Sequence, residues 1–361
     1  MSKTIFHLVY HFGGRGAVEA RAAFDAVTQA KAGHKVVIIT DHSAAPAPPG
    51  VEVISSGWRI PEPTRELIRV AALAATLRKA LSRNTPDSIV FHSGTLGWPA
   101  IRTARRIGAL SVYVVHAQML ERIQNGGSPF GPLRTRFYLS ADRHSLHKSD
   151  RIINVSRYMS DFAKTQGVSS EKMKTVPNVF RAETAFSEPS DRDVDIVFAG
   201  RFAPEKGLDV LVKALGTMPT DLKVMIIGDG PLRDQLLPKI AKLPMHVQTP
   251  GWVPRDKLLA IFRRSKILVV PSRSEPQGVV VLEGMSAGAV VVGSRAGGIP
   301  EMVSHGDNGF LFAVDDAAEL RSTLATALET DLFPYATRAY DTVTRYSPES
   351  IYDLTLSSYV R

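Results

Sequence analysis

The chain has 361 residues, of which 44% are hydrophobic and 22% are charged, a balance typical of a globular protein with two domains. It has no cysteine, so disulfides, cysteine nucleophiles and cysteine metal sites are excluded. No apolar run approaches the ~18 residues of a membrane span, and His7 and His11 interrupt the N-terminal run. We therefore expect neither a span nor a secretory leader, and we place the protein in the cytoplasm.

Short apolar runs alternate with helical periodicities along the first half of the chain. Strands are predicted at 4–10, 35–40, 51–54, 88–91, 110–115 and 151–155. Helices are predicted at 18–31, 66–82 and 96–107. This alternation predicts βαβ units and a parallel sheet.

The same alternation of strands and helices is predicted in the second half of the chain. Strands are predicted at 195–199, 223–227, 246–249, 267–271 and 290–293, and helices at 208–215, 232–240, 255–263, 280–287 and 317–328. The polar segment 177–193 separates the halves, so we predict one domain over 1–178 and a second over 179–345. Helix 348–359 follows, and its periodicity does not assign it to a domain. Ligands of such sheets bind outside the carboxyl ends of the strands.

Positive charge is concentrated in the first half. Residues 1–180 hold 24 lysines and arginines against 12 acidic residues, and the rest hold 20 against 23, for a net charge of +9. This asymmetry indicates an anionic partner: nucleic acid, anionic lipid or a phosphorylated acceptor. A surface merely rich in lysine and arginine explains it equally well. No aromatic-and-basic stacking pattern supports nucleic acid.

Two segments of the second half could hold a sugar diphosphate. Arg201 and Lys206 follow a predicted strand, where two cations can clamp a diphosphate or be ordinary surface charges. The backbone amides of Gly278, Val279 and Val280 begin a predicted helix and form an anion site. Glu275 would repel a phosphate there, so it either accepts hydrogen bonds from hydroxyl groups or only caps the helix. Taken by itself, Glu283 is interpreted as a solvent-exposed residue of the helix.

The motifs together resemble those of the family 4 retaining glycosyltransferases. In order they are Gly13-Gly14, Gly33-His34-Lys35-Val36, Gly200-Arg201-x4-Lys206-Gly207, Gly228-Asp229-Gly230-Pro231, Glu275-Pro-x-Gly278-x4-Glu283 and Gly297-Gly298-Ile-Pro300-Glu301. The resemblance implies the GT-B fold, two Rossmann-like doubly wound parallel-sheet domains facing a central cleft. It also implies that the terminal helix, within 346–361, crosses back to the first domain.

The resemblance implies a role for each site residue. Arg201 and Lys206 would hold the donor diphosphate, Glu275 the sugar hydroxyls and Glu283 the ribose, with the amides at 278–280 touching phosphate or sugar. His116, at a strand end, would face the donor sugar; the other nine histidines lack that context. The first loop would place Gly14 at the donor, and Gly13 and Arg15 would lie on the acceptor side together with His116. The chain departs from the family pattern at Arg15, Gln277 and Gly284.

The sequence predicts no metal and no cofactor apart from the donor substrate, a UDP-sugar in preference to a GDP-sugar. The D-x-D strings at Asp191, Asp193 and Asp195 precede a strand and so lie at the wrong edge of the sheet. With Arg201 and Lys206 present, a divalent ion is unnecessary.

The acceptor is expected on the first domain, and we expect a glycan or a lipid-linked molecule. Segment 117–136, rich in glycine and proline, is predicted as a long loop bordering it. Docking on an anionic membrane surface would use the basic helical residues Arg65, Arg69, Arg78, Lys79, Arg83, Arg102, Arg105 and Arg106. A generally basic soluble domain is the competing interpretation.

The predicted function is a retaining hexosyl transfer from a nucleotide-diphosphate sugar in lipopolysaccharide or exopolysaccharide synthesis. A sugar-nucleotide epimerase of the same fold and an inactive sugar-nucleotide-binding scaffold subunit remain alternatives. A phosphorylase would need a lysine for pyridoxal phosphate, and no lysine stands out for that role.

Overall fold

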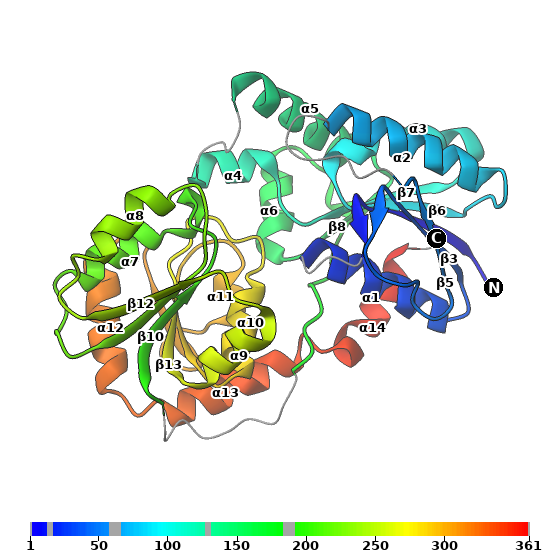
Figure 1. The fold of residues 1–361 in the computed structure, drawn as a ribbon. Coiled ribbons are helices and arrows are strands. Elements are labelled where there is room, and N and C mark those ends of the chain that lie inside the picture. The colour runs from blue at the N-terminus through cyan, green and yellow to red at the C-terminus, as the bar shows by residue number, and fades with distance from the viewer. Residues whose placement is uncertain (1, 13–16, 58–65, 127–130, 183–191, 360–361) are drawn as a thin grey trace. The chain divides into compact units, whose positions relative to one another are not determined.

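The computed structural model describes residues 2–12, 17–57, 66–126, 131–182 and 192–359 (Figure 1). Two units divide the chain: unit 1 comprises Met1–Leu120, Ser128–Val179 and Pro348–Arg361, and unit 2 comprises Glu121–Gly127 and Phe180–Ser347. The sequence placed the boundary at 178/179, one residue before the start of the long segment of unit 2. No helix among the described residues is long and apolar enough to cross a bilayer.

Unit 1 is built on a seven-stranded parallel sheet in the order β5-β3-β1-β6-β7-β8-β9. The strands are β1 (Thr4–Leu8), β3 (Lys35–Thr40), β5 (Val51–Ser55), β6 (Ser88–Phe91), β7 (Leu110–Val115), β8 (Arg151–Asn154) and β9 (Met173–Thr175), with a separate pair β2 (His11–Phe12) and β4 (His42–Ser43). The helices are α1 (Ala17–Lys31), α2 (Glu66–Leu81), α3 (Gly97–Ile107), α4 (Met119–Gly126), α5 (Pro132–Lys148), α6 (Arg157–Thr165) and α14 (Pro348–Tyr359).

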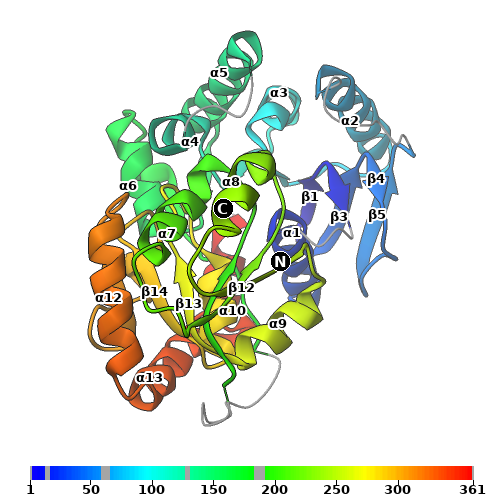
Figure 2. The ribbon, with the colours of Figure 1, turned by 60° about the vertical axis from the view of Figure 1, so that its left-hand side comes forward.

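The two faces of this sheet bury different residues of the same strands. Phe6 and Leu8 of β1 pack with Leu73 and Leu77 of α2, whereas the alternate residue His7 points to the face covered by α1 and α14. Figures 1 and 2 show α2 and α3 on one side of the sheet and α1 on the other. The period of two along a strand therefore sends His7 to the side of the sheet opposite Phe6 and Leu8, where it meets the buried polar side chains of α1.

Unit 2 repeats this plan with six parallel strands in the order β12-β11-β10-β13-β14-β15. The strands are β10 (Val194–Ala199), β11 (Lys223–Ile227), β12 (His246–Gly251), β13 (Ser265–Val270), β14 (Val290–Ser294) and β15 (Gly309–Phe312). The helices are α7 (Leu208–Leu215), α8 (Arg233–Ile240), α9 (Arg255–Arg263), α10 (Val279–Ser286), α11 (Ile299–Met302), α12 (Ala317–Glu329) and α13 (Phe333–Thr344). Both sheets agree with the predicted doubly wound class.

The predicted long loop 117–136 is wrong. The structure has α4 at Met119–Gly126, and α5 begins at Pro132. A proline with no N–H is tolerated at the first position of a helix, so Pro132 starts α5. Gly126 is the last residue of α4. The sequence predicts a loop over the whole stretch because glycine and proline cluster between the two helices.

The last helix, α14, is held on unit 1 through its carboxyl end. Ser88 Oγ donates to the Tyr359 carbonyl at 2.7 Å, Arg151 to the Ser358 carbonyl at 3.0 Å, and Lys174 Nζ to the Ser357 carbonyl at 2.8 Å. The last carbonyls of a helix receive no hydrogen bond from within the helix, so these three need donors from elsewhere. The positive charges of Arg151 and Lys174 also interact favourably with the negative end of the helix dipole. The terminal helix is therefore part of unit 1.

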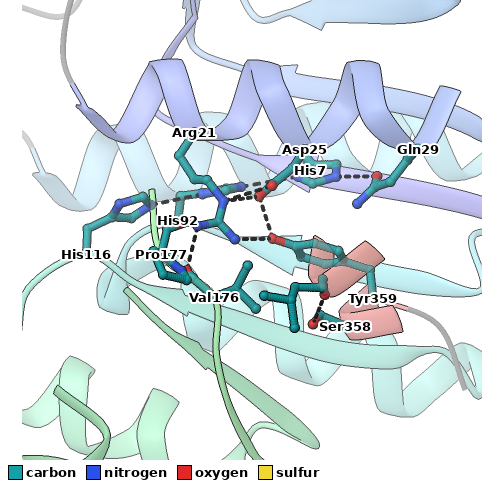
Figure 3. Close-up of polar contacts among 11 residues, drawn as sticks. His7, Arg21, Asp25, Gln29, His92, His116, Val176, Pro177, Ser358 and Tyr359 are labelled. Atoms are coloured by element: carbon teal, nitrogen blue, oxygen red, sulfur yellow. Dashed lines mark hydrogen bonds and ion pairs between the residues drawn. The ribbon is translucent and has the colours of Figure 1, made fainter. Parts of the chain in front are cut away.

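A buried ion pair lies beneath α14 (Figure 3). Arg21 Nε donates to both carboxylate oxygens of Asp25 at 2.8 Å, and the Tyr359 hydroxyl donates to the same carboxylate. Arg21 also donates to the carbonyls of Val176 and Pro177, each at 2.8 Å. Burial and the Asp25 charge raise the pKa of Tyr359 well above its usual range, so the phenol keeps its proton and donates it.

The variant Tyr359→Phe should destabilise unit 1. It leaves a buried carboxylate oxygen of Asp25 without its hydroxyl donor, a loss of about 1–3 kcal/mol in the free energy of unfolding. Denaturant unfolding followed by circular dichroism measures this change. Tyr352→Phe on the same helix, where the side chain is only partly buried, is the matched control. Equal stability of both variants would contradict the role assigned to the hydroxyl.

Candidate functional site

The chemistry-bearing residues of unit 2 meet where the strand order reverses. β10 lies between β11 and β13, so the helices that follow β10 and β13 turn to opposite faces of the sheet, and sheets of this kind bind ligands at the strand ends of such a reversal. The turn after β10 carries Lys206, and the turn after β13 carries Glu275. Lys206 Nζ donates to Glu275 Oε2 at 2.6 Å, and Ser272 Oγ donates to the same oxygen at 3.2 Å. Two predicted site residues, 69 positions apart, are thereby brought together.

Arg273 fixes the two turns against each other. Its guanidinium donates to both carboxylate oxygens of Asp209 at 2.9 and 2.7 Å, to Asp315 at 2.6 Å and to the Pro204 carbonyl at 2.6 Å. Burial alone would raise the pKa of Asp209, but the hydrogen bonds and charge of Arg273 outweigh it and hold that pKa below its ordinary value. The sequence motifs did not point to Arg273. The signals that could have found it are an arginine in the turn after a strand and an acidic residue in the first turn of a helix.

The glycine motif at 297–298 packs against the back of the Glu275 turn. Gly297 has φ of +55°, and a Cβ there would lie 2.0 Å from the Glu275 carbonyl oxygen. The Gly298 N–H donates to that same carbonyl at 2.8 Å. Any side chain at position 297 would displace the turn, so the motif positions Glu275 by allowing backbone to lie on backbone.

The predicted anion site at the start of α10 has the expected backbone. Gly278 is the residue before the helix, with φ of +94°, and Val279 and Val280 are its first two residues. The first N–H groups of a helix have no acceptor within the helix, so they can bind an anionic oxygen.

Glu283 lies on α10 and is not a solvated residue. Its side chain is 13% exposed, and Arg255 Nε of α9 donates to its Oε1 at 2.9 Å. Arg255 also lies over the Phe180 ring, 5.7 Å from its centroid. The carboxylate is therefore oriented by the protein, which is what a group that recognises ligand hydroxyls requires.

Arg201 differs from Lys206 in having no partner. Its side chain is exposed, and within the described part of the chain its guanidinium makes no hydrogen bond or ion pair. Of the two predicted cations, one is held by Glu275 and the other is available to an incoming anion.

In unit 1, His116 follows β7 and begins a row of hydrogen-bonded side chains (Figure 3). His116 Nε2 lies 3.2 Å from His92 Nδ1, His92 Nε2 lies 3.2 Å from His7 Nδ1, and His7 Nε2 lies 2.8 Å from Gln29 Oε1. We call these four residues the histidine row. Nothing in the sequence linked His7 and His92 to His116, but β1, β6 and β7 are neighbouring strands and bring the three histidines together.

Burial keeps the histidine row uncharged. It lowers the pKa of His116 to about 3, with the Arg21 charge adding to the effect. Burial also places the pKa of His92 well below its ordinary value, reinforced by His116, His7 and Arg21. The pKa of His7 is lowered by burial despite the nearby Asp25 carboxylate.

The remaining predicted residues are either outside the described residues or away from the strand-end turns. Gly13, Gly14, Arg15, Arg65 and Asp191 fall outside the described residues. Asp193 pairs with Arg264, and Asp195 accepts from Lys266 at 2.7 Å at the start of β10, the edge opposite the site.

Arg69 is a correction to the predicted basic surface. It is 4% exposed and donates to Asp41 at 2.7 Å, with its guanidinium 4.3 Å from the centroid of the Tyr10 ring. A buried, paired arginine cannot contact a membrane. The remaining described residues of that set are exposed: Arg78, Lys79, Arg83, Arg102, Arg105 and Arg106.

Unit 1 should lose stability as the pH falls from 7 to 5. The unfolded chain protonates its histidines near pH 6.5 while the folded row stays neutral, so the unfolded state binds more protons in this window. Each histidine then lowers the free energy of unfolding by up to about 1.4 kcal/mol per pH unit.

Denaturant unfolding across this pH range measures the slope. Asp142 opposes it, because burial raises its pKa to about 6 despite hydrogen bonds from Met119 and Tyr113. The variant Asp142→Asn should therefore steepen the slope. Constant or rising stability on acidification would contradict a neutral row.

Comparisons with known proteins agree with this geometry in both halves of the chain. Residues 180–342 match the family model of glycosyl transferases group 1, and residues 16–179 match that of the glycosyl transferase 4-like domain. An uncharacterised glycosyltransferase of Methanocaldococcus jannaschii is 31% identical over 185 residues, 50% of each chain. A D-inositol 3-phosphate glycosyltransferase of Mycolicibacterium vanbaalenii is 26% identical over 97% of this chain and 86% of its own. The chain thus spans about half the length of the first relative.

Solved structures share the fold over nearly the whole chain. Sucrose-phosphate synthase from Thermosynechococcus elongatus has a TM-score of 0.81 at 19% identity, covering 98% of both chains. Anabaena HepE, solved in complex with UDP-glucose, has a TM-score of 0.75 at 20% identity, again covering 98% of both. WaaG, a glycosyltransferase involved in lipopolysaccharide biosynthesis, has a TM-score of 0.74 at 18% identity, covering 97% of this chain and 99% of its own.

Each half of the chain matches a family model of glycosyltransferases, and solved glycosyltransferase structures share the two-domain fold over nearly the whole chain, so the chain belongs to the family 4 glycosyltransferases and has the GT-B fold.

Proposed function

We propose that this protein transfers a hexose from a nucleotide-diphosphate sugar, a UDP-sugar in preference to a GDP-sugar, to a glycan or lipid-linked acceptor. The observation that carries the proposal is the Lys206–Glu275 pair at the switch point of unit 2, with the unpartnered Arg201 on the same turn. The complex of HepE with UDP-glucose supports a nucleotide-sugar donor.

The donor diphosphate binds the cations of the turn after β10. Arg201 takes phosphate oxygens through its planar fork, and Lys206 exchanges part of its contact with Glu275 for the diphosphate. The amides of Gly278, Val279 and Val280 contribute neutral donors to the same anion. As the bond to the sugar breaks, negative charge grows on the leaving diphosphate, and these fixed positive groups stabilise it.

The carboxylates select the neutral parts of the donor. Glu275, when Lys206 turns to the diphosphate, has an oxygen free for the sugar hydroxyls, and Ser272 still holds it in place. Glu283, oriented by Arg255, binds the ribose hydroxyls. His116 supplies a neutral hydrogen-bonding group of unit 1 to the donor sugar.

The reaction proceeds with retention and without a divalent metal. Retention is what the family 4 resemblance implies. Two cations and a helix N-terminus provide the positive charge that a metal ion supplies in other transferases.

The acceptor belongs to lipopolysaccharide or exopolysaccharide synthesis at the inner face of the cell membrane. The exposed arginines and lysine of α2 and α3 support an anionic surface as the docking partner. The same helix α2 exposes the apolar side chains Leu67 and Ile68 in its first turn, and exposed apolar and basic side chains on one helix suit the boundary between lipid headgroups and acyl chains. The shared fold with WaaG is consistent with this role.

Binding of the donor should stabilise the protein without a metal. At 100 times its Kd, a ligand adds about 2.7 kcal/mol to the free energy of unfolding and raises Tm by several degrees. A thermal-shift panel of UDP, GDP, ADP, CMP and their sugars, with and without EDTA, measures this. We expect a shift with UDP that EDTA does not change. A shift that requires a divalent ion would refute metal-free binding, and no shift with any nucleotide would favour a scaffold role.

The variant Arg201→Ala should lower kcat by about 100- to 1000-fold, because it removes a charge that stabilises the leaving diphosphate. Its Tm should stay near that of the wild type, since the Arg201 side chain is exposed and unpaired. Steady-state transfer assays measure the loss, and Arg321→Ala on α12, also exposed, is the matched control. Activity within a few-fold of the wild type would remove Arg201 from the site.

Formation of an isomer of the donor sugar nucleotide in the absence of any acceptor would point to an epimerase.

A further inference from the structure

The histidine row ends at an unpartnered nitrogen. His116 Nδ1 is buried and has no hydrogen-bond partner among the described residues, and neither has the Gln29 side-chain nitrogen at the other end of the row. Every nitrogen between these two ends faces another nitrogen or the Gln29 oxygen. The row therefore has one free atom at each end and no free atom within it.

Proton counting restricts the row to two arrangements. A neutral imidazole carries one proton, and each of the two nitrogen–nitrogen contacts needs one proton to be a hydrogen bond. All three histidines must therefore have the same tautomer, Nε2–H throughout or Nδ1–H throughout. One residue that fixes the tautomer at one end fixes it at the other.

Gln29 decides between the two arrangements. Its Oε1 faces His7 Nε2 at 2.8 Å, and a carbonyl oxygen can only accept, so His7 carries its proton on Nε2. His92 then donates from Nε2 to His7 Nδ1, and His116 donates from Nε2 to His92 Nδ1. His116 Nδ1 is left unprotonated, as a pure acceptor.

We propose that Gln29, His7 and His92 are positioning residues that fix the tautomer of His116 and leave its Nδ1 as a hydrogen-bond acceptor. The inference rests on the proposed function only in giving His116 a role at the donor sugar. A ring locked in one tautomer presents one hydrogen-bonding pattern, whereas a free imidazole divides its population between two.

The surroundings of the row favour a neutral state. The charged groups facing it are Arg21 and Asp25 of α1, which pair with each other, and Tyr359 of α14 donates its hydroxyl proton to Asp25. Tyr359 also lies against His7, with ring centroids 5.8 Å apart. An extra proton on the row would be placed near the Arg21 cation, and no carboxylate contacts His92 or His116 within the described residues.

Nitrogen-15 NMR of the ligand-free protein tests the tautomer directly. Two-bond nitrogen–hydrogen correlations of the histidine rings distinguish the Nε2–H, Nδ1–H and doubly protonated forms. We expect His7, His92 and His116 all in the Nε2–H form, unchanged from pH 8 to pH 5.5. A protonated His116, an Nδ1–H form, or two tautomers within the row would overturn the proposal, whether or not the protein has the proposed activity.

The variants Gln29→Met and His92→Phe break the row without changing His116. Each should convert the His116 signals to a mixture of the two tautomers, and His147→Gln on the exposed side of α5 should leave them unchanged. If His92→Phe does not fold, Gln29→Met carries the same test from the far end of the row. An unaltered His116 in both variants would overturn the proposal.

Activity separates positioning from general destabilisation. We expect His92→Phe to lower kcat/KM about tenfold, and the pair His92→Phe/His116→Ala to lose no more than His116→Ala alone. If the double variant loses a further tenfold in kcat/KM relative to His116→Ala, His92 acts on folding and not through His116. If His116→Ala retains full activity, the proposed role of His116 at the sugar is wrong, while the tautomer measurement still decides whether the row is locked.

Discussion

The reversal of strand order beside the first strand of each sheet is the constraint from which both sites follow. In unit 2 the strands β10 and β13 lie side by side at this reversal, and the turns that follow them are joined by one ion pair, Lys206–Glu275. In unit 1 the same reversal makes β1 and β6 neighbours, so His7 and His92 come into line with His116 after β7. Parallel strands all end at one edge of a sheet, and that edge collects the polar residues.

The two units treat charge in opposite ways. Unit 2 has its candidate cations near solvent, where Arg201 makes no ion pair with any described residue and Lys206 is held by the Glu275 carboxylate. In unit 1 the polar row is buried and its histidines stay neutral, and the buried cation beside the row, Arg21, is paired with Asp25. This division suits a donor whose charge lies in the diphosphate and whose sugar is neutral.

Arginines that bridge distant segments support the candidate site and the terminal helix. Arg273 ties the turn after β13 to the start of α7, and Gly297 lets the backbone lie directly on the Glu275 carbonyl. Arg21 joins α1, the Val176–Pro177 carbonyls and α14 in the same manner. In each case one guanidinium satisfies several acceptors from distant segments, which its planar array of donors makes possible.

The sequence by itself determined the periodic elements, the two-unit plan and the motif residues 200–207, 275–283 and 297–301, because strand period, helix period and turn chemistry are local. It gave β3, β6 and β7 with their observed bounds but missed β9 and β15, which have only three and four residues. It misjudged Arg69, since nothing near it in sequence reveals that Asp41 lies beneath. Only the tertiary structure decided that Lys206 meets Glu275, that Arg273 joins two turns and that three histidines form one row, because strand order, not sequence distance, sets which side chains are neighbours.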